Sequence, residues 1–443
     1  MQRIFPAWWL SPRGVWALLA LAALTAVASV VAWVVLADYL CAVLFLAALL
    51  ADLRLGPGPQ ALRVVRDPPL RLALRRPERV AYDVENRSAT PVRVGLVETP
   101  LAAIDFSQDT VLGAVPAHAS VTLEQSVLAR ERGLVTFGTI FLWAQNAIGL
   151  VRRRYAVPGD LEVRVFPDLS AVEEYGTLAR RNTLLEQGLR KLRLRGVGTE
   201  FESMREYAPD DAFRNIDWKT SARRGRLMVQ QREIERSQQV LILLDCGRLM
   251  VARMGAQRKF DYALTAGLSV ARVAQTAGDN VGLIAFAGKP ILSIAPRRGE
   301  AHVAALARAS YDLQPRLEEP DYEWTFADVN RRYSKRSLIV LFTDIFDPAA
   351  SAEVLAGLGH LARRHAVLCV LMNDAAIASA LSQEPQRIEE AYRASVAMRL
   401  ADERATAIAH LRARGVIVVD VPAAKLTVAL LDAYLDIKAR GKI

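Results

Sequence analysis

The longest apolar stretch lies near the amino-terminal end and constrains the fold more than any other feature. The 23 residues from Val15 to Ala37 carry no charge, and after Asp38 the residues from Tyr39 to Ala51 are apolar again. A transmembrane helix needs roughly 20 apolar residues, so the sequence predicts at least one membrane pass. A cleaved signal peptide is the alternative, but this stretch is too long for a signal-peptide core and shows no small-residue cleavage site.

Arginines on both sides of the stretch bear on whether it crosses once or twice. Arg3 and Arg13 precede it, and Arg54, Arg63, Arg66, Arg71, Arg75 and Arg76 follow it. Cationic flanks favour the cytoplasm, so both ends are expected inside, which requires an even number of passes. We therefore predict a hairpin with passes near 15–33 and 37–53, set in a bacterial inner membrane with the soluble domains facing the cytoplasm. A single long pass, with Asp38 near one end, is the alternative.

The net charge of +10 is compatible with nucleic acid or a membrane surface as partner, so its distribution matters. Residues 1–76 hold eight arginines and three acidic residues, a net +5. The rest of the chain carries the other half without interleaved aromatic residues, so membrane lipid is the expected partner and nucleic acid is not. The three cysteines, Cys41, Cys246 and Cys369, are far apart, which excludes a disulfide framework.

The soluble part begins after the Gly-Pro-Gly-Pro sequence at 56–59. Short stretches with alternating apolar residues follow at Leu70–Leu74, Val80–Val84, Val92–Val97, Val121–Val127 and Leu134–Trp143. Several short strands at about ten-residue spacing predict an antiparallel β-sandwich, which we assign to residues 56–165. A charged connecting segment, 166–238, comes next, with a helix expected at Leu178–Arg195.

From residue 239 onward, apolar strands alternate with helical stretches. The expected strands are Val240–Leu244, Val281–Phe286, Ile291–Ala295, Leu338–Phe342, Val367–Met372 and Val416–Val419. This alternation predicts an α/β doubly wound, Rossmann-like domain over 239–443, with a mostly parallel sheet covered on both faces. In such folds ligands bind at the carboxyl ends of the strands.

Two aspartates stand at those strand ends. Asp245 follows the first strand and Asp344 follows a later one. Here the chain resembles a von Willebrand factor A domain, whose metal site has the pattern Asp-x-Ser-x-Ser, a distant Thr and a later Asp. That resemblance implies Mg²⁺, the hard cation that oxygen ligands suit. Gly247 and Leu249 replace the two serines, however, and the expected Thr loop, Arg297–His302, offers no hydroxyl. We therefore expect metal binding at Asp245 and Asp344 to be weak or absent, with no other cofactor.

The segment before the first strand carries a second, longer resemblance. It contains Arg205-Glu206-Tyr207, then Asp210-Asp211, Arg214, Asp217-Trp218 and Arg223. This signature is similar to that of the bacterial domain-of-unknown-function fifty-eight family. The resemblance covers most of the chain, including a membrane hairpin (1–55), a β-rich domain and the von Willebrand A-like domain. The alternating charges are interpreted either as a partner-binding surface or as an ion-pair network that docks the segment, with Trp218 as a buried anchor; we favour the network.

No arrangement of nucleophile and base, no nucleotide-binding loop and no histidine–cysteine metal set is recognisable. The sequence therefore predicts a non-enzymatic, membrane-anchored interaction protein. The family resemblance implies a MoxR-type AAA+ ATPase as its partner, docked through the von Willebrand A-like domain. The alternative is a metal-dependent hydrolase in which Asp245 and Asp344 hold a metal that activates water.

Overall fold

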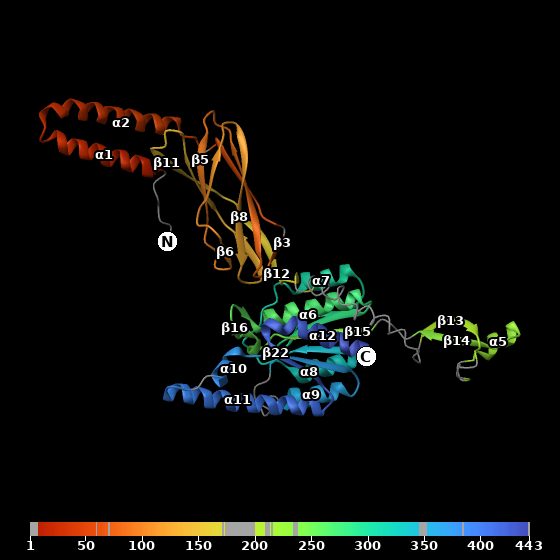
Figure 1. Cartoon of the computed structure of the whole chain (residues 1–443). Helices are drawn as coiled ribbons and strands as arrows, with labels where there is room; N and C mark the ends of the chain where they lie inside the picture. Colours follow the sequence, from red (N-terminus) through yellow and green to blue (C-terminus); the bar gives the residue numbers. More distant parts are fainter. Residues whose placement is uncertain are drawn as a thin grey trace. The chain divides into compact units, whose positions relative to one another are not determined.

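The computed structural model describes residues 8–58, 60–69, 71–170, 172, 200–208, 213, 216–233, 238–344, 352–382 and 385–441. Contacts within the chain define two compact units, Met1–Phe166 and Pro167–Ile443. The helix expected at Leu178–Arg195 lies outside the described residues. Figure 1 labels the helices and strands of both units.

A helical hairpin opens the first unit. Helix α1 spans Pro12–Ala28 and α2 spans Val35–Leu55, joined through a short 3₁₀ turn at Ala32–Val34. The helices run side by side (Figure 1), and the Thr25 hydroxyl donates to the Asp38 carboxylate at 2.9 Å. The predicted hairpin is confirmed as two helices, although α1 ends five residues before the expected position because the chain turns at Ser29. By length and composition α2 can cross a membrane, whereas α1 has 17 residues and is shorter.

The base of the hairpin is bound to the neighbouring β domain. Strand β1 (Trp8–Leu10), just before α1, pairs antiparallel with β11 (Val151–Val157). Near the end of α2 the Asp52 carboxylate accepts the backbone N–H groups of Leu150 and Val151 at 2.7 and 2.6 Å. The start of α1 and the end of α2 therefore meet at the same turn of the β domain.

The β domain is built from short strands, as the alternating pattern predicts. Its elements are β2 (Leu62–Asp67), β3 (Arg71–Ala73), β4 (Pro77–Asn86), β5 (Val92–Glu98), β6 (Ile104–Phe106), β7 (Val111–Val115), β8 (Ala119–Ala129), β9 (Gly133–Phe137), β10 (Ile140–Gln145) and β12 (Leu161–Phe166). They form sheets of order β1-β11-β10-β5-β7, β2-β4-β8-β6 and β3-β12-β9. The prediction of purely antiparallel pairing is wrong at one place, because β3 and β12 pair in parallel. Inward side chains such as Tyr82 and Phe137 are fully buried in one shared core. Alternation of buried and exposed positions, seen clearly in β4, is what places one face of each strand in that core.

The second unit contains a small hairpin that carries part of the family-like signature. Strands β13 (Glu200–Glu206) and β14 (Met228–Glu233) pair antiparallel, and the short helix α5 (Trp218–Arg224) lies between them in the chain. Asp217 caps α5, because its carboxylate accepts the Thr220 N–H at 2.8 Å. The Ser221 hydroxyl in turn accepts the Met228 N–H at 2.8 Å, which fixes α5 against the start of β14.

The remainder of the unit is built on a six-stranded sheet of order β19-β18-β15-β20-β21-β22. Its strands are β15 (Gln239–Asp245), β18 (Asn280–Phe286), β19 (Pro290–Arg297), β20 (Leu338–Phe342), β21 (Ala366–Asn373) and β22 (Ile417–Pro422). All pair in parallel except β19, which is antiparallel at one edge. In sequence order the sheet reads 3-2-1-4-5-6, the order of doubly wound folds, and its direction reverses between β15 and β20. The predicted α/β domain is confirmed at this level.

Helices cover both faces of the sheet (Figure 1). One face packs against α6 (Lys259–Thr276), α7 (Glu300–Ser310) and α12 (Leu426–Ala439), and the other against α8 (Tyr322–Arg332), α9 (Ala352–Ala362) and α11 (Ile388–Ala413). The shorter elements are α10 (Ala375–Ser382), the 3₁₀ turns Arg248–Val251 and Ala423–Lys425, and the two-residue strands β16 (Arg253–Met254) and β17 (Gln257–Arg258). The central strand β20 is buried along its whole length, and β15 is buried from Val240 onward, which explains their continuous apolar sequences.

Candidate functional site at the carboxyl edge of the sheet

The two predicted aspartates lie at the same edge of the sheet. Asp245 is the last residue of β15, and Asp344 follows the neighbouring parallel strand β20 by two residues. Thr343 links them, because its hydroxyl donates to Asp245 at 2.7 Å. This edge lies at the point where strand order reverses, which is where doubly wound folds bind ligands.

The Asp245 carboxylate is buried and surrounded by donors. Its Oδ2 accepts the hydroxyls of Tyr322 and Thr343 at 2.6 and 2.7 Å. Its Oδ1 accepts the backbone N–H of Gly247 at 2.7 Å. Burial raises the pKa of Asp245, the three hydrogen bonds lower it, and the nearby Asp344 charge raises it further, so that the net direction is upward. The two hydroxyls were missed in the sequence, although Thr343 stands directly beside a predicted site residue.

The Asp344 carboxylate is bound by two cations. Its Oδ2 contacts the ammonium of Lys259 at the first residue of α6, and its Oδ1 accepts Arg404 Nη1 from α11 at 2.7 Å. Arg404 also forms an ion pair with Asp420 on β22, at 2.9 Å. The side chains of Lys259 and Asp344 are 2% and 0% exposed, so this is an internal ion pair.

The donor set at this edge does not fit a divalent cation. A metal bound by Asp245 and Asp344 would have to displace the Lys259 ammonium and compete with the donors already on both carboxylates. A serine in place of Gly247 is also excluded by space, because a Cβ there would lie 2.6 Å from the Pro320 ring. Among the described residues no group of three or more histidine, cysteine or acidic side chains is arranged to hold a metal.

The expected Thr loop, Arg297–His302, is at the wrong end of the sheet. Arg297 pairs with Val281, near the start of β18, whereas Asp245 pairs with Phe286, at its end. The segment that reaches Asp245 is instead 314–322. It is fixed by the backbone hydrogen bond from Arg316 N–H to Cys246 O at 2.7 Å. The prediction placed the loop 297–302 wrongly because sequence periodicity does not show that β19 is antiparallel. An antiparallel strand ends at the opposite edge of the sheet from Asp245.

Of the described signature residues, Glu206, Trp218 and Arg223 are exposed, and Tyr207 and Asp217 are half-buried. Arg205 and Glu206 lie on β13, and Glu206 pairs with Arg226. The Tyr207 ring lies 5.8 Å from that of Phe213. Asp210, Asp211 and Arg214 lie outside the described residues.

Trp218 is 63% exposed and Arg223 is exposed too. The interpretation of Trp218 as a buried anchor is therefore wrong. Trp218 is the first residue of the seven-residue helix α5, directly after its cap, and its side chain is exposed. Ser221 in the same helix is buried, and its hydroxyl binds the Met228 N–H.

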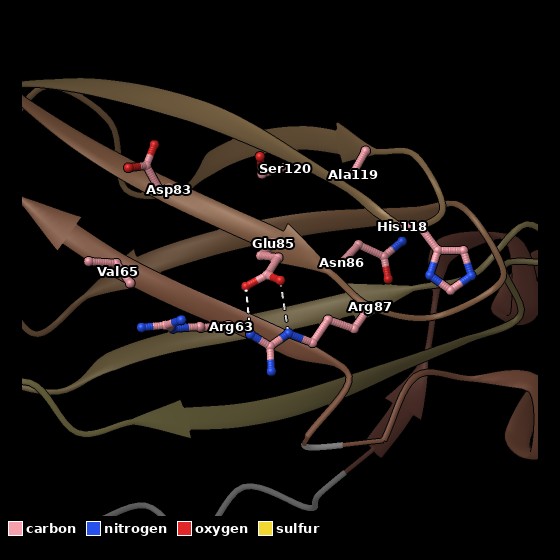
Figure 2. A pocket seen from close by; sticks show the side chains of 9 residues that line it. All are labelled: Arg63, Val65, Asp83, Glu85, Asn86, Arg87, His118, Ala119 and Ser120. Carbon is pink, nitrogen blue, oxygen red and sulfur yellow. Dashed lines mark hydrogen bonds and ion pairs between the residues drawn. The ribbon is translucent and has the colours of Figure 1, made fainter.

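A shallow hollow of about 650 Å³ lies on the β domain (Figure 2). It is lined by Arg63, Val65, Asp83, Glu85, Asn86, Arg87, His118, Ala119 and Ser120. Glu85 and Arg87, two positions apart in the chain, form an ion pair at 2.9 Å in this hollow. Their hydrogen bond lowers the pKa of Glu85 and raises that of Arg87. With two arginines opposite two carboxylates, its charge is nearly balanced at neutral pH.

Comparison with known proteins agrees with the resemblance of the signature region. The family described as "Protein of unknown function DUF58" matches residues 203–384. A stretch of 43 residues is 49% identical to the "Uncharacterized protein YeaD" of Bacillus subtilis (strain 168), covering 10% of this chain and 11% of that protein.

Two solved structures are similar to part of the chain. The PapD-like domain 7 of human CEP192 covers 25% of this chain and 90% of its own length, at 12% identity and a TM-score of 0.20. WR4, an MSP family member of C. elegans, covers 24% and 98%, at 10% identity and a TM-score of 0.15.

Proposed function

We propose that this protein is a non-enzymatic interaction protein anchored in a bacterial inner membrane, with its soluble domains in the cytoplasm. The observation that carries the proposal is the hairpin. Apolar side chains such as Leu44 (65% exposed) cover its outer surface, which water would disfavour and lipid would accept. Both ends of the hairpin are bound to the turn at Leu150, and this arrangement is the one that a two-pass anchor with both ends on one side requires.

The proposed partner is a MoxR-type AAA+ ATPase, docked on the carboxyl edge of the α/β sheet. The von Willebrand A-like assignment is supported by the strand order with its antiparallel edge strand. At this edge Leu317 is 83% exposed although its segment is ordered by backbone hydrogen bonds at Arg316 and Glu318. A fixed, exposed leucine is a suitable anchor for a partner. The exposed Trp218 supports the partner-binding interpretation of the signature.

The geometry argues against the metal-dependent hydrolase. Hydrolysis by this route needs an ion that activates water, and both carboxylates that would hold the ion already have internal donors. A general base at Asp245 is disfavoured as well, because that carboxylate is 1% exposed.

Anchoring is tested by fractionation of the full chain. We expect it to stay in the membrane pellet after alkaline carbonate washing, and a variant lacking residues 12–55 to be released. Full-length protein in the carbonate supernatant would contradict anchoring.

Docking is tested with a purified MoxR-type ATPase from the same genome, measured against the full chain in nanodiscs with and without ATP. We expect Leu317→Asp to weaken binding at least tenfold, since a central apolar anchor is worth roughly 2 kcal/mol. The matched control is Leu112→Asp on β7, because Leu112 is also well exposed (65%) but lies on the β domain. Equal loss in both variants, or no binding by the unaltered protein, would count against the docking face.

A further inference from the structure

We infer that Lys259 acts as an internal cation that holds the carboxyl edge of the sheet without a metal. Its ammonium contacts one oxygen of Asp344, and Arg404 binds the other at 2.7 Å. A carboxylate and two cationic side chains from three different segments of the chain are thus joined at this edge. That this edge is a docking face rests on the proposed function; the ion pair and its consequences do not.

Because Asp344 is buried, its negative charge needs nearby positive charges. The side chain of Asp344 is fully buried, and a carboxylate in such a place needs cationic or hydrogen-bonding partners. Lys259 and Arg404 each carry a positive charge, and Asp420 carries a negative charge in addition to that of Asp344. A divalent ion bound here would add two positive charges beside the buried Lys259 and Arg404 side chains, which is strongly unfavourable.

The same group joins the two helix layers across the edge. Lys259 begins α6, on one face of the sheet, and Arg404 belongs to α11, on the other. Arg404 also donates to the Met372 carbonyl at the end of β21 at 3.0 Å. The arrangement of strand ends is therefore set by side chains of the chain itself, so binding at this edge should be indifferent to divalent cations and chelators.

The test is a double-mutant cycle on the full chain in nanodiscs, with Lys259→Met, Asp344→Asn and both together. We expect Lys259→Met to lower Tm by on the order of 10 °C, because it leaves a buried carboxylate short of one cation. The double variant should recover at least half of that loss, since the carboxylate charge is removed as well. Lys438→Met is the matched control: Lys438 pairs with the buried Asp279 at 2.7 Å, near the amino end of β18, and its effect should be additive with Asp344→Asn.

Metal binding is measured on the same samples by Mn²⁺ electron paramagnetic resonance and by Tm with Mg²⁺ or EDTA. For the unaltered protein we expect neither bound Mn²⁺ nor a Tm shift. Stoichiometric Mn²⁺ binding that Asp344→Asn abolishes would overturn the inference, as would additivity of Lys259→Met with Asp344→Asn. If a variant fails to fold, the measurements on the unaltered protein still decide the metal question. None of these readouts involves the ATPase, so failure of the docking proposal would be seen separately.

Discussion

Asp52, near the end of α2, accepts the backbone N–H of Val151 at 2.6 Å, across 99 residues of sequence. The neighbouring N–H of Leu150 donates to the same oxygen at 2.7 Å. Ser11, before α1, donates its hydroxyl to the carbonyl of Gly149 at 2.5 Å. Hydrogen bonds therefore join the hairpin and the β domain at this turn. The domain boundary predicted from the sequence, between residues 55 and 56, passes through this hydrogen-bonded region.

The first prediction concerns Asp52→Ala. Two backbone donors would lose a buried carboxylate acceptor, so we expect a destabilisation of about 3 kcal/mol. Hydrogen exchange of the full chain in micelles should show the Leu150 and Val151 amides exchanging at least 100-fold faster. Asp160→Ala, an exposed carboxylate in the same unit, is the control and should change stability by less than about 0.5 kcal/mol. Unchanged protection at Leu150 would contradict the assigned role of Asp52.

The second prediction concerns the close approach at the start of α1. A Cβ at Gly14 would lie 2.3 Å from the Leu150 carbonyl oxygen, a backbone atom that cannot turn away. Gly14→Ala should therefore separate the hairpin from the β domain, although alanine is a better helix former than glycine by about 1 kcal/mol. The measurement is protease sensitivity of the chain between α2 and β2 in micelles. Gly58→Ala, where a Cβ meets nothing within 4 Å, should leave the cleavage rate unchanged.

The sequence predicted the hairpin, the β domain and the α/β sheet because each has a local periodic signal. The contacts that join them have no such signal. In the sequence Asp52 is only a charged residue near the end of an apolar helix. The backbone N–H groups that it accepts belong to a turn nearly 100 residues away. Exposure of Trp218 was mispredicted for the same reason, since aromatic character alone does not reveal which way a capped helix faces.

The candidate site shows the same limit. Asp245 and Asp344 were found because strand ends can be recognised in sequence. Lys259 was not, because a lysine at a helix start, 85 residues from Asp344, ordinarily reaches into solvent. The sequence motifs therefore gave no sign that Lys259 contacts Asp344.

The third prediction concerns Trp218. Because its side chain is 63% exposed, Trp218→Ala should change the free energy of unfolding by less than about 0.5 kcal/mol. If the signature is a partner surface, the same change should weaken ATPase binding at least tenfold, as loss of a tryptophan anchor commonly does. Calorimetry of binding and thermal unfolding on one sample separates these effects. A large fall in Tm with intact binding would restore the structural interpretation of the signature.

The fourth prediction concerns His365, between α9 and β21, which is 1% exposed. Within the described part of the chain, neither of its ring nitrogens has a hydrogen-bond partner. Burial lowers the pKa of His365, and the charges of Arg364 and Arg336 lower it further. The unfolded chain therefore binds a proton more readily than the folded one, so stability falls as the pH drops from about 6.5 through the folded pKa.

We expect His365→Leu to remove this dependence. The Tm of the unaltered protein, relative to that of His365→Leu, should fall steadily between about pH 7 and pH 5, since only the unaltered protein must bury or protonate the imidazole. Asp245, whose raised pKa acts in the opposite direction, is present in both proteins and cancels in the difference. His360→Leu is the control because His360 is exposed, and its curve should run parallel to that of the unaltered protein. Parallel curves for His365→Leu as well would show that His365 does not titrate differently in the folded state.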